Sequence, residues 1–335
     1  MTDLAKRRSL TVFASVLAGS CLPRLARAGA VRDDHPRRWR GTAMGAEATI
    51  FFEGVDEKTA DRLIGQITQE IDRLEGIFSL YRPESTLSRL NAKGVVIGPE
   101  QEFTELLVLA QHFAEITGGA FDPTVQPLWQ ALADLSVNKV RDEALIDRTV
   151  LRALDDVGYK NLIVSEGRVS FNRPGMQATL NGIAQGYMTD RIANMLSENG
   201  FCNVLVDLGE HRATGPRISG DPWNVRIKSP FTGLPGREAI NLFADALATS
   251  GGYGFRFDLP GKRSHLLDPR TGASPVIWDS LSVRAASATE ADALSTAFSV
   301  MAPAEIATVL PLTRVSLVLG LPVANEKPVK MLQAG

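Results

Sequence analysis

Helical and strand patterns mix along this chain of 335 residues without a regular period. The strongest helical spacing of apolar residues runs from Asp56 to Phe78, and weaker helical patterns cover 102–116, 183–198, 290–301 and 303–310. Short strands are expected at 48–52, 162–164, 169–171, 204–206, 224–227, 246–248, 282–285 and 315–319. A doubly wound sheet would alternate strands and helices regularly, so this pattern predicts an α+β fold.

Composition excludes several classes of protein. Hydrophobic residues make up 44% of the chain and charged residues only 22%, which is enough apolar material for a core and argues against disorder. The formal net charge of −2, without a basic run interleaved with aromatic residues, gives no surface suited to nucleic acid. We therefore expect a globular protein that does not bind nucleic acid.

The N-terminus has the layout of an export signal. A basic start at 6–8 precedes an apolar stretch at 10–19 and a small-residue cleavage pattern at 26–28. The apolar stretch is too short to span a bilayer. We predict an export signal over 1–28, a polar leader over 29–40, one domain over 41–335, and a periplasmic mature protein.

The adjacent arginines near the N-terminus favour one type of export signal. Arg7 and Arg8 are adjacent and resemble the twin-arginine signal, which we favour, although Lys6 stands where Ser or Thr is usual. An ordinary secretory signal with a basic start is the alternative. A lipoprotein signal ending at Cys21 fits less well, because Ala18 occupies the usual Leu position.

The residues available for metal binding favour a hard cation. Two cysteines and four histidines are scattered without zinc-type spacing, so a bound metal should have oxygen ligands. Asp292 and Thr296 lie four positions apart on one face of a predicted helix and suit Mg²⁺. The spacing alone favours another interpretation, in which Thr289 and Asp292 form a helix capping box.

Other polar segments are weak signals individually. His265 lies on a short predicted strand before an Asp-Pro turn, where it is a candidate general base or a structural residue. Glycine-rich segments at 118–123, 179–187 and 248–253 allow close backbone approach to a ligand, but tight turns explain each of them equally well. Common nucleotide-binding and hydrolase motifs are missing.

Taken together and in order, a series of segments resembles the ApbE family of FAD:protein FMN transferases. They are Met44–Gly45, Phe78–Asn91, Gly119–Pro123, Gly182–Tyr187, Asp207–Gly209, Ala248–Gly251, His265–Gly272 and Ala291–Thr296. The resemblance covers almost the whole predicted mature domain. It implies a single ApbE-like domain, similar to a T-fold, with mixed helices and a mainly antiparallel sheet.

The resemblance also implies roles for particular residues. Asp292, Thr296 and the carbonyl of Gly182 match the Mg²⁺ ligands, and His265 matches the histidine that activates the acceptor hydroxyl. The positions that match or adjoin the FAD site are Met44, Tyr81, Ala120, Phe121, Asp122, Thr179, Gln185 and Leu267.

The implied reaction is attack by a Ser or Thr hydroxyl of a partner protein on the FMN-side phosphorus of FAD, which releases AMP. The chain departs from the family at Thr179, where Asp is usual, at Gln185, where Lys or Glu is usual, and at Glu210-His211, where Gly-Asn is usual. The alternatives are an FAD pyrophosphatase and a non-catalytic periplasmic flavin carrier.

The resemblance also suggests acceptors. An exported family member with a twin-arginine-like signal is most similar to the NosX type, which acts on the membrane regulator NosR during nitrous oxide reductase maturation. Flavin-carrying subunits of the Rnf and Nqr complexes are the other expected partners.

Overall fold

The computed structural model describes residues 37–228, 235–257, 263–274, 277–323 and 328–332, so the predicted export signal and residues 29–36 lie outside the described residues. The helices are α1 (Glu57–Phe78), α2 (Thr86–Lys93), α3 (Gln101–Ile116), α4 (Gln126–Val137), α5 (Glu143–Leu154), α6 (Ala184–Glu198), α7 (Ala288–Phe298) and α8 (Pro303–Val309), with short 3₁₀ turns η1 (Tyr159–Asn161) and η2 (Leu310–Leu312). Within the described part, no helix has both the length and the apolar character needed to cross a bilayer.

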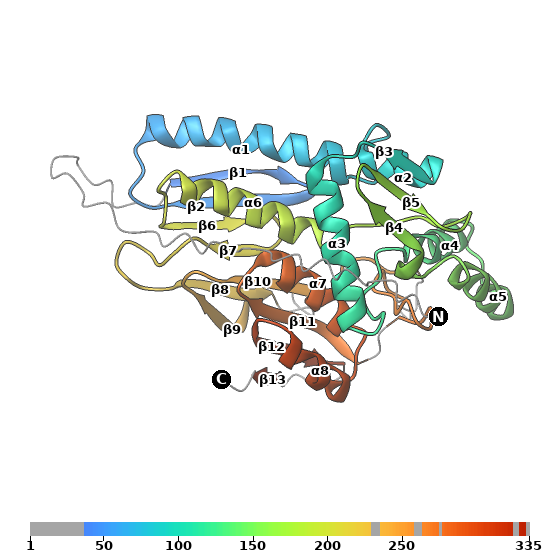
Figure 1. The fold of residues 1–335 in the computed structure, drawn as a ribbon. Helices are drawn as coiled ribbons and strands as arrows, with labels where there is room; N and C mark the ends of the chain where they lie inside the picture. Colours follow the sequence, from blue (N-terminus) through green and yellow to red (C-terminus); the bar gives the residue numbers. More distant parts are fainter. Residues whose placement is uncertain (1–36, 229–234, 258–262, 275–276, 324–327, 333–335) are drawn as a thin grey trace, which may run out of the picture.

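An eight-stranded antiparallel sheet forms the centre of the fold, in the order β1-β2-β6-β7-β10-β11-β12-β13 (Figure 1). Its strands are β1 (Arg37–Ala43), β2 (Ala46–Phe52), β6 (Val204–Asp207), β7 (His211–Ala213), β10 (Ala246–Gly251), β11 (Trp278–Ala285), β12 (Val315–Pro322) and β13 (Val329–Leu332). The smaller sheets contain β3 (Val95–Ile97), β5 (Arg168–Phe171) and β4 (Leu162–Ser165), and the hairpin of β8 (Trp223–Lys228) and β9 (Pro235–Leu242). The predicted α+β class and antiparallel sheet are confirmed.

The large sheet is buried on both faces. Val204 and Val206 belong to the main core, which includes α1, α6 and α7, whereas Leu205 between them packs in a second cluster with the β8–β9 hairpin. The same alternation separates Ala248 from Leu247 in β10. Successive side chains of a strand point to opposite faces, so helices cover one face and the hairpin covers the other.

Strand β1 corrects the predicted domain start. The strand begins at Arg37, so residues 37–40 of the predicted leader belong to the sheet and pair with β2. The sequence pattern did not indicate this strand, because β1 is an edge strand and its Arg38 and Arg40 are exposed to solvent. On the same strand the Trp39 ring lies over Gly41, where a Cβ atom would meet it at 2.3 Å.

Helices α6 and α7 pack unusually closely at Gly186. A Cβ atom there would lie 2.3 Å from the carbonyl oxygen of Ala288 and 2.7 Å from Cβ of Asp292. Any larger side chain would push the helices apart. This contact brings the start of α6 against the face of α7 that carries Asp292 and Thr296.

Candidate active site

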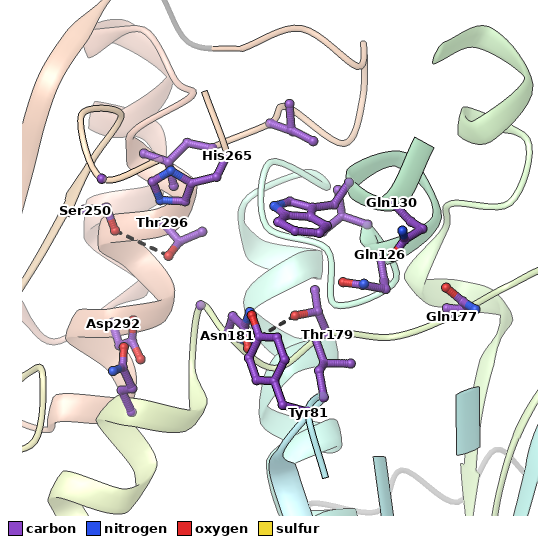
Figure 2. A pocket seen from close by; sticks show the side chains of 18 of the residues that line it. Tyr81, Gln126, Gln130, Gln177, Thr179, Asn181, Ser250, His265, Asp292 and Thr296 are labelled. Atoms are coloured by element: carbon purple, nitrogen blue, oxygen red, sulfur yellow. Dashed lines mark hydrogen bonds between the residues drawn. The ribbon is translucent and has the colours of Figure 1, made fainter. Parts of the chain in front are cut away.

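A pocket of about 780 Å³ opens beside α7 and β10 and is closed on its other side by α4 (Figure 2). It brings together most of the residues singled out in the sequence, although they come from distant segments. The predicted site residues on its wall are Tyr81, Thr179, Gly182, Gln185, His265, Leu267, Asp292 and Thr296.

Three other predicted site residues lie behind this wall or away from it. Met44 occupies the β1–β2 turn with a φ of 50°, and its N–H donates to Oε1 of Glu75 at 2.7 Å. Ala120 and Phe121 are buried in the main core, where the Phe121 ring lies 3.3 Å from the position of a Cβ on Gly182. Their contact with flavin stays a prediction.

Asp122 also lies outside the lining of the pocket. Its carboxylate accepts hydrogen bonds from N–H and Oγ1 of Thr124 at 2.7 and 2.6 Å and from N–H of Tyr159 at 2.9 Å. Burial raises the pKa of Asp122 above its ordinary value. Asp122 therefore fixes the loop that contains Thr124 and Tyr159 in place, and its contact with FAD stays a prediction.

Side-chain oxygen atoms of α7 and β10 lie at one end of the pocket, close to Gly182, which precedes α6. Oδ2 of the buried Asp292 accepts from N–H of Gly186 at 2.9 Å, and burial raises the pKa of Asp292 to about 7. Oγ1 of Thr296 lies 3.4 Å from Oγ of Ser250 and 2.9 Å from where a Cβ of Gly182 would stand. The predicted metal ligands thus lie close together.

These donors fit Mg²⁺. No group of three or more His, Cys, Asp or Glu side chains suited to a metal occurs in the described ranges, so a cation here would need hydroxyl and carbonyl oxygens besides carboxylate. Asp292 has no ion pair with a basic side chain among the described residues, and a buried carboxylate of this kind favours a bound cation. Mg²⁺ binds such oxygen sets and shares them with substrate phosphates.

A buried ion pair positions α7, and sequence reasoning missed it. Asp190 on α6 accepts from N–H of Ala288 and N–H of Thr289, both at 2.9 Å, and from Oγ1 of Thr289 at 2.6 Å, and it pairs with Arg212. The N-cap of α7 is Ser287. The alternative interpretation of Thr289 as the start of a capping box is therefore wrong.

His265 faces the pocket (Figure 2) from a loop, so the prediction that it lies on a strand is wrong. Among the described residues, the only strand-like pairing next to it is the isolated bridge between Arg256 and Ser264. Nδ1 lies 3.1 Å from the carbonyl oxygen of Phe255. A carbonyl can only accept, so Nδ1 carries the proton and Nε2 is left as the acceptor. Burial lowers the pKa of His265 below its ordinary value of 6.5, which keeps the ring neutral.

The far wall of the pocket was also missed in the sequence. Gln126, Trp129 and Gln130 of α4 line it, and Trp129 stacks with Phe255 at a ring separation of 6.1 Å. An aromatic surface beside neutral amides suits a planar ring with hydrogen-bonding edges. Pro127 at the start of α4 was the available sequence signal for this helix.

The fold and pocket define an α+β domain in which oxygen donors suited to a cation and a neutral histidine line one site. Residues 44–317 match the ApbE family, and relatives above 30% identity cover more than two thirds of the chain. The chain belongs to the ApbE family.

Known relatives match over most of their length. The FAD:protein FMN transferase of Vibrio cholerae strain O395 is 31% identical over 278 residues, which are 78% of this chain and 80% of the relative. That of Salmonella typhimurium strain LT2 is 29% identical over 273 residues, 78% of this chain and 77% of the relative. The crystal structure of the ApbE protein of Thermotoga maritima superposes with a TM-score of 0.75 at 29% identity, covering 89% of this chain and 97% of that one.

Proposed function

We propose that this chain is an Mg²⁺-dependent FAD:protein FMN transferase. The observation that carries the proposal is the convergence of Asp292, Thr296, Gly182 and His265 on one pocket, from segments that lie far apart in the sequence. The names of the relatives support the flavin chemistry.

The proposed reaction makes one bond and breaks one. The oxygen of an acceptor Ser or Thr bonds to the FMN-side phosphorus of FAD, the pyrophosphate linkage to the AMP side breaks, and AMP leaves with that bonding electron pair. Nε2 of His265 takes the hydroxyl proton. Mg²⁺ held by Asp292, Thr296 and the Gly182 carbonyl would neutralise charge on the phosphate oxygens.

His265 predicts the acid side of the pH profile. Because burial lowers its pKa, the neutral base persists as pH falls past the ordinary value of 6.5, and activity should decline only below that value. We expect His265→Ala to lower the rate about 100-fold or more and to remove this acid limb. The check is the rate of flavin transfer across pH 5 to 9 at saturating Mg²⁺, because the pKa of Asp292, about 7 without a metal, would otherwise add a decline of its own. A wild-type decline centred above 6.5, or the same limb in the variant, would contradict the assignment.

We also propose a periplasmic location and a membrane electron-transfer acceptor. The N-terminal signal pattern supports export by the twin-arginine route, and the NosX-type resemblance favours a NosR-like acceptor over Rnf-like or Nqr-like subunits. Fusing residues 1–40 to a reporter that is active only after folded export tests the route. Replacing Arg7 and Arg8 with lysines should stop that export, and unchanged export would favour the ordinary secretory route.

The activity is tested by labelling. The chain is incubated with FAD, Mg²⁺ and a flavin-accepting domain of each proposed kind, and each domain is paired with a variant whose acceptor hydroxyl residue is replaced by Ala. The Vibrio cholerae relative serves as a positive control for acceptor competence. Flavin fluorescence on the intact acceptor alone supports the proposal, and no label on any acceptor that the control labels would refute it.

A further inference from the structure

Glu210 is a second buried carboxylate of the pocket, and the reaction above makes no use of it. It lies in the turn between β6 and β7, is 7% exposed, and lines the same pocket as Asp292. A carboxylate is rarely buried to this extent without a partner of opposite charge. The buried carboxylate of Glu210 should therefore have a positively charged partner that stabilises it.

The protein holds Glu210 in place from two sides. Its backbone oxygen accepts from Oγ1 of Thr189 on α6 at 3.3 Å, and its Oε2 accepts from N–H of Thr249 on β10 at 3.2 Å. The turn itself needs Gly209, whose φ is 103°. One carboxylate oxygen is thus fixed by the backbone, while Oε1 has no hydrogen-bond partner within the described ranges.

The electrostatics of the pocket disfavour two carboxylates without a counterion. Burial, followed by repulsion from Asp292, raises the pKa of Glu210 well above its ordinary value. No basic side chain forms an ion pair with Glu210 or Asp292 in the described part of the chain. A divalent cation would remove the repulsion and offset the loss of hydration of both groups.

We propose that Glu210 is a further acidic group of the cation site, which supplies its second negative side chain together with Asp292. This inference rests on the proposed function, since it concerns the same cation. The site then offers two carboxylate side chains to the cation before FAD adds its phosphates. A divalent cation should therefore bind to the protein in the absence of FAD.

Metal binding tests this directly and needs no activity assay. The full chain is freed of metal by chelation and titrated with Mn²⁺ alone, and free Mn²⁺ is followed by electron paramagnetic resonance. Glu210→Gln keeps the size of the side chain and an acceptor for Thr249 but removes the charge, so Mn²⁺ affinity should fall about 10-fold or more.

Asp207→Asn is the matched control. Asp207 ends β6 three residues earlier, and it also contributes one negative charge to the surroundings of Glu210. Its carboxylate accepts from N–H of Gly209 at 3.2 Å and pairs with His211, outside the pocket lining. We expect Asp207→Asn to bind Mn²⁺ as the wild type does, so a loss confined to Glu210→Gln cannot come from net charge alone.

The outcomes separate the hypotheses. Glu210→Gln with wild-type Mn²⁺ affinity, or a wild type that binds no Mn²⁺ without FAD, would overturn the inference. Asp292→Asn should also lose Mn²⁺, and retention there would reject the cation site itself. Metal-free Glu210→Gln should unfold at no lower temperature than the wild type, which excludes misfolding. Glu210-dependent Mn²⁺ binding without acceptor labelling would refute only the proposed function.

Discussion

Asp292→Asn is expected to lower the rate of FMN transfer at least about 100-fold, which corresponds to about 2.7 kcal/mol of transition-state stabilisation. The carboxylate is buried at the end of the pocket where Thr296 and Gly182 converge, and asparagine cannot supply its charge to a cation. The asparagine oxygen can still accept from N–H of Gly186, so the contact between α6 and α7 should persist. Single-turnover labelling at saturating FAD and Mg²⁺ measures the loss.

Glu290→Gln is the matched control on the same helix. Glu290 is two residues earlier on α7, and its carboxylate accepts from N–H of Arg314 at 2.8 Å, outside the pocket lining. The substitution removes the same charge and keeps an acceptor for that bond. Near-wild-type transfer by Glu290→Gln is expected, and an equal loss in both variants would mean that charge on α7, and not a cation ligand, explains the effect.

Of the substitutions proposed here, Asp190→Ala should lower the free energy of unfolding the most. Removing this carboxylate leaves Arg212 without its buried partner and the N–H groups of Ala288 and Thr289 without their acceptors. Loss of one partner of such a pair costs about 3 kcal/mol or more, and the melting temperature should fall by about 6 °C or more. Denaturant and thermal unfolding measure both quantities.

The same variant links stability to the site. Because Asp190 anchors the first turn of α7, the spacing of Asp292 and Thr296 should loosen, and Mn²⁺ binding should weaken along with stability. Asp134→Ala, at an exposed position on α4, should change the free energy of unfolding by less than about 0.5 kcal/mol. If Asp190→Ala unfolds like this control, the anchoring function of Asp190 is wrong.

Local patterns were sufficient for the elements with one buried face. Helix α1 shows this best, because Leu63, Ile67, Ile71 and Leu74 recur at helical spacing and all are buried in the main core. The spacing of apolar residues predicts which face of a helix or strand is buried, but it does not predict which element packs against that face. The eight expected strands and the α+β class could be predicted for the same reason, whereas β1, β3, β7, β9 and β13 were missed.

Features created by distant contacts could not be predicted in this way. Asp190 and Ala288 are 98 residues apart, and no local spacing signals their bond. Strand β1 depends on pairing with β2, and its arginines resemble a polar leader.

The location of the pocket could be predicted in part. The residues of the proposed cation site and His265 were chosen through a family resemblance, and the structure places them in one pocket. Glu210 was noticed only as a departure from the family pattern. Its burial in the pocket follows from the β6–β7 turn, which the sequence did not reveal.

The most direct test of the central claim is AMP release measured with and without a competent acceptor, alongside the amount of flavin bound to that acceptor. A transferase predicts AMP and labelled acceptor in equal amounts, and almost no AMP when the acceptor hydroxyl is absent. AMP release that does not depend on acceptor would identify an FAD pyrophosphatase, and tight FAD binding without AMP would identify a carrier. Either result would contradict the proposal that this chain transfers FMN to a protein hydroxyl.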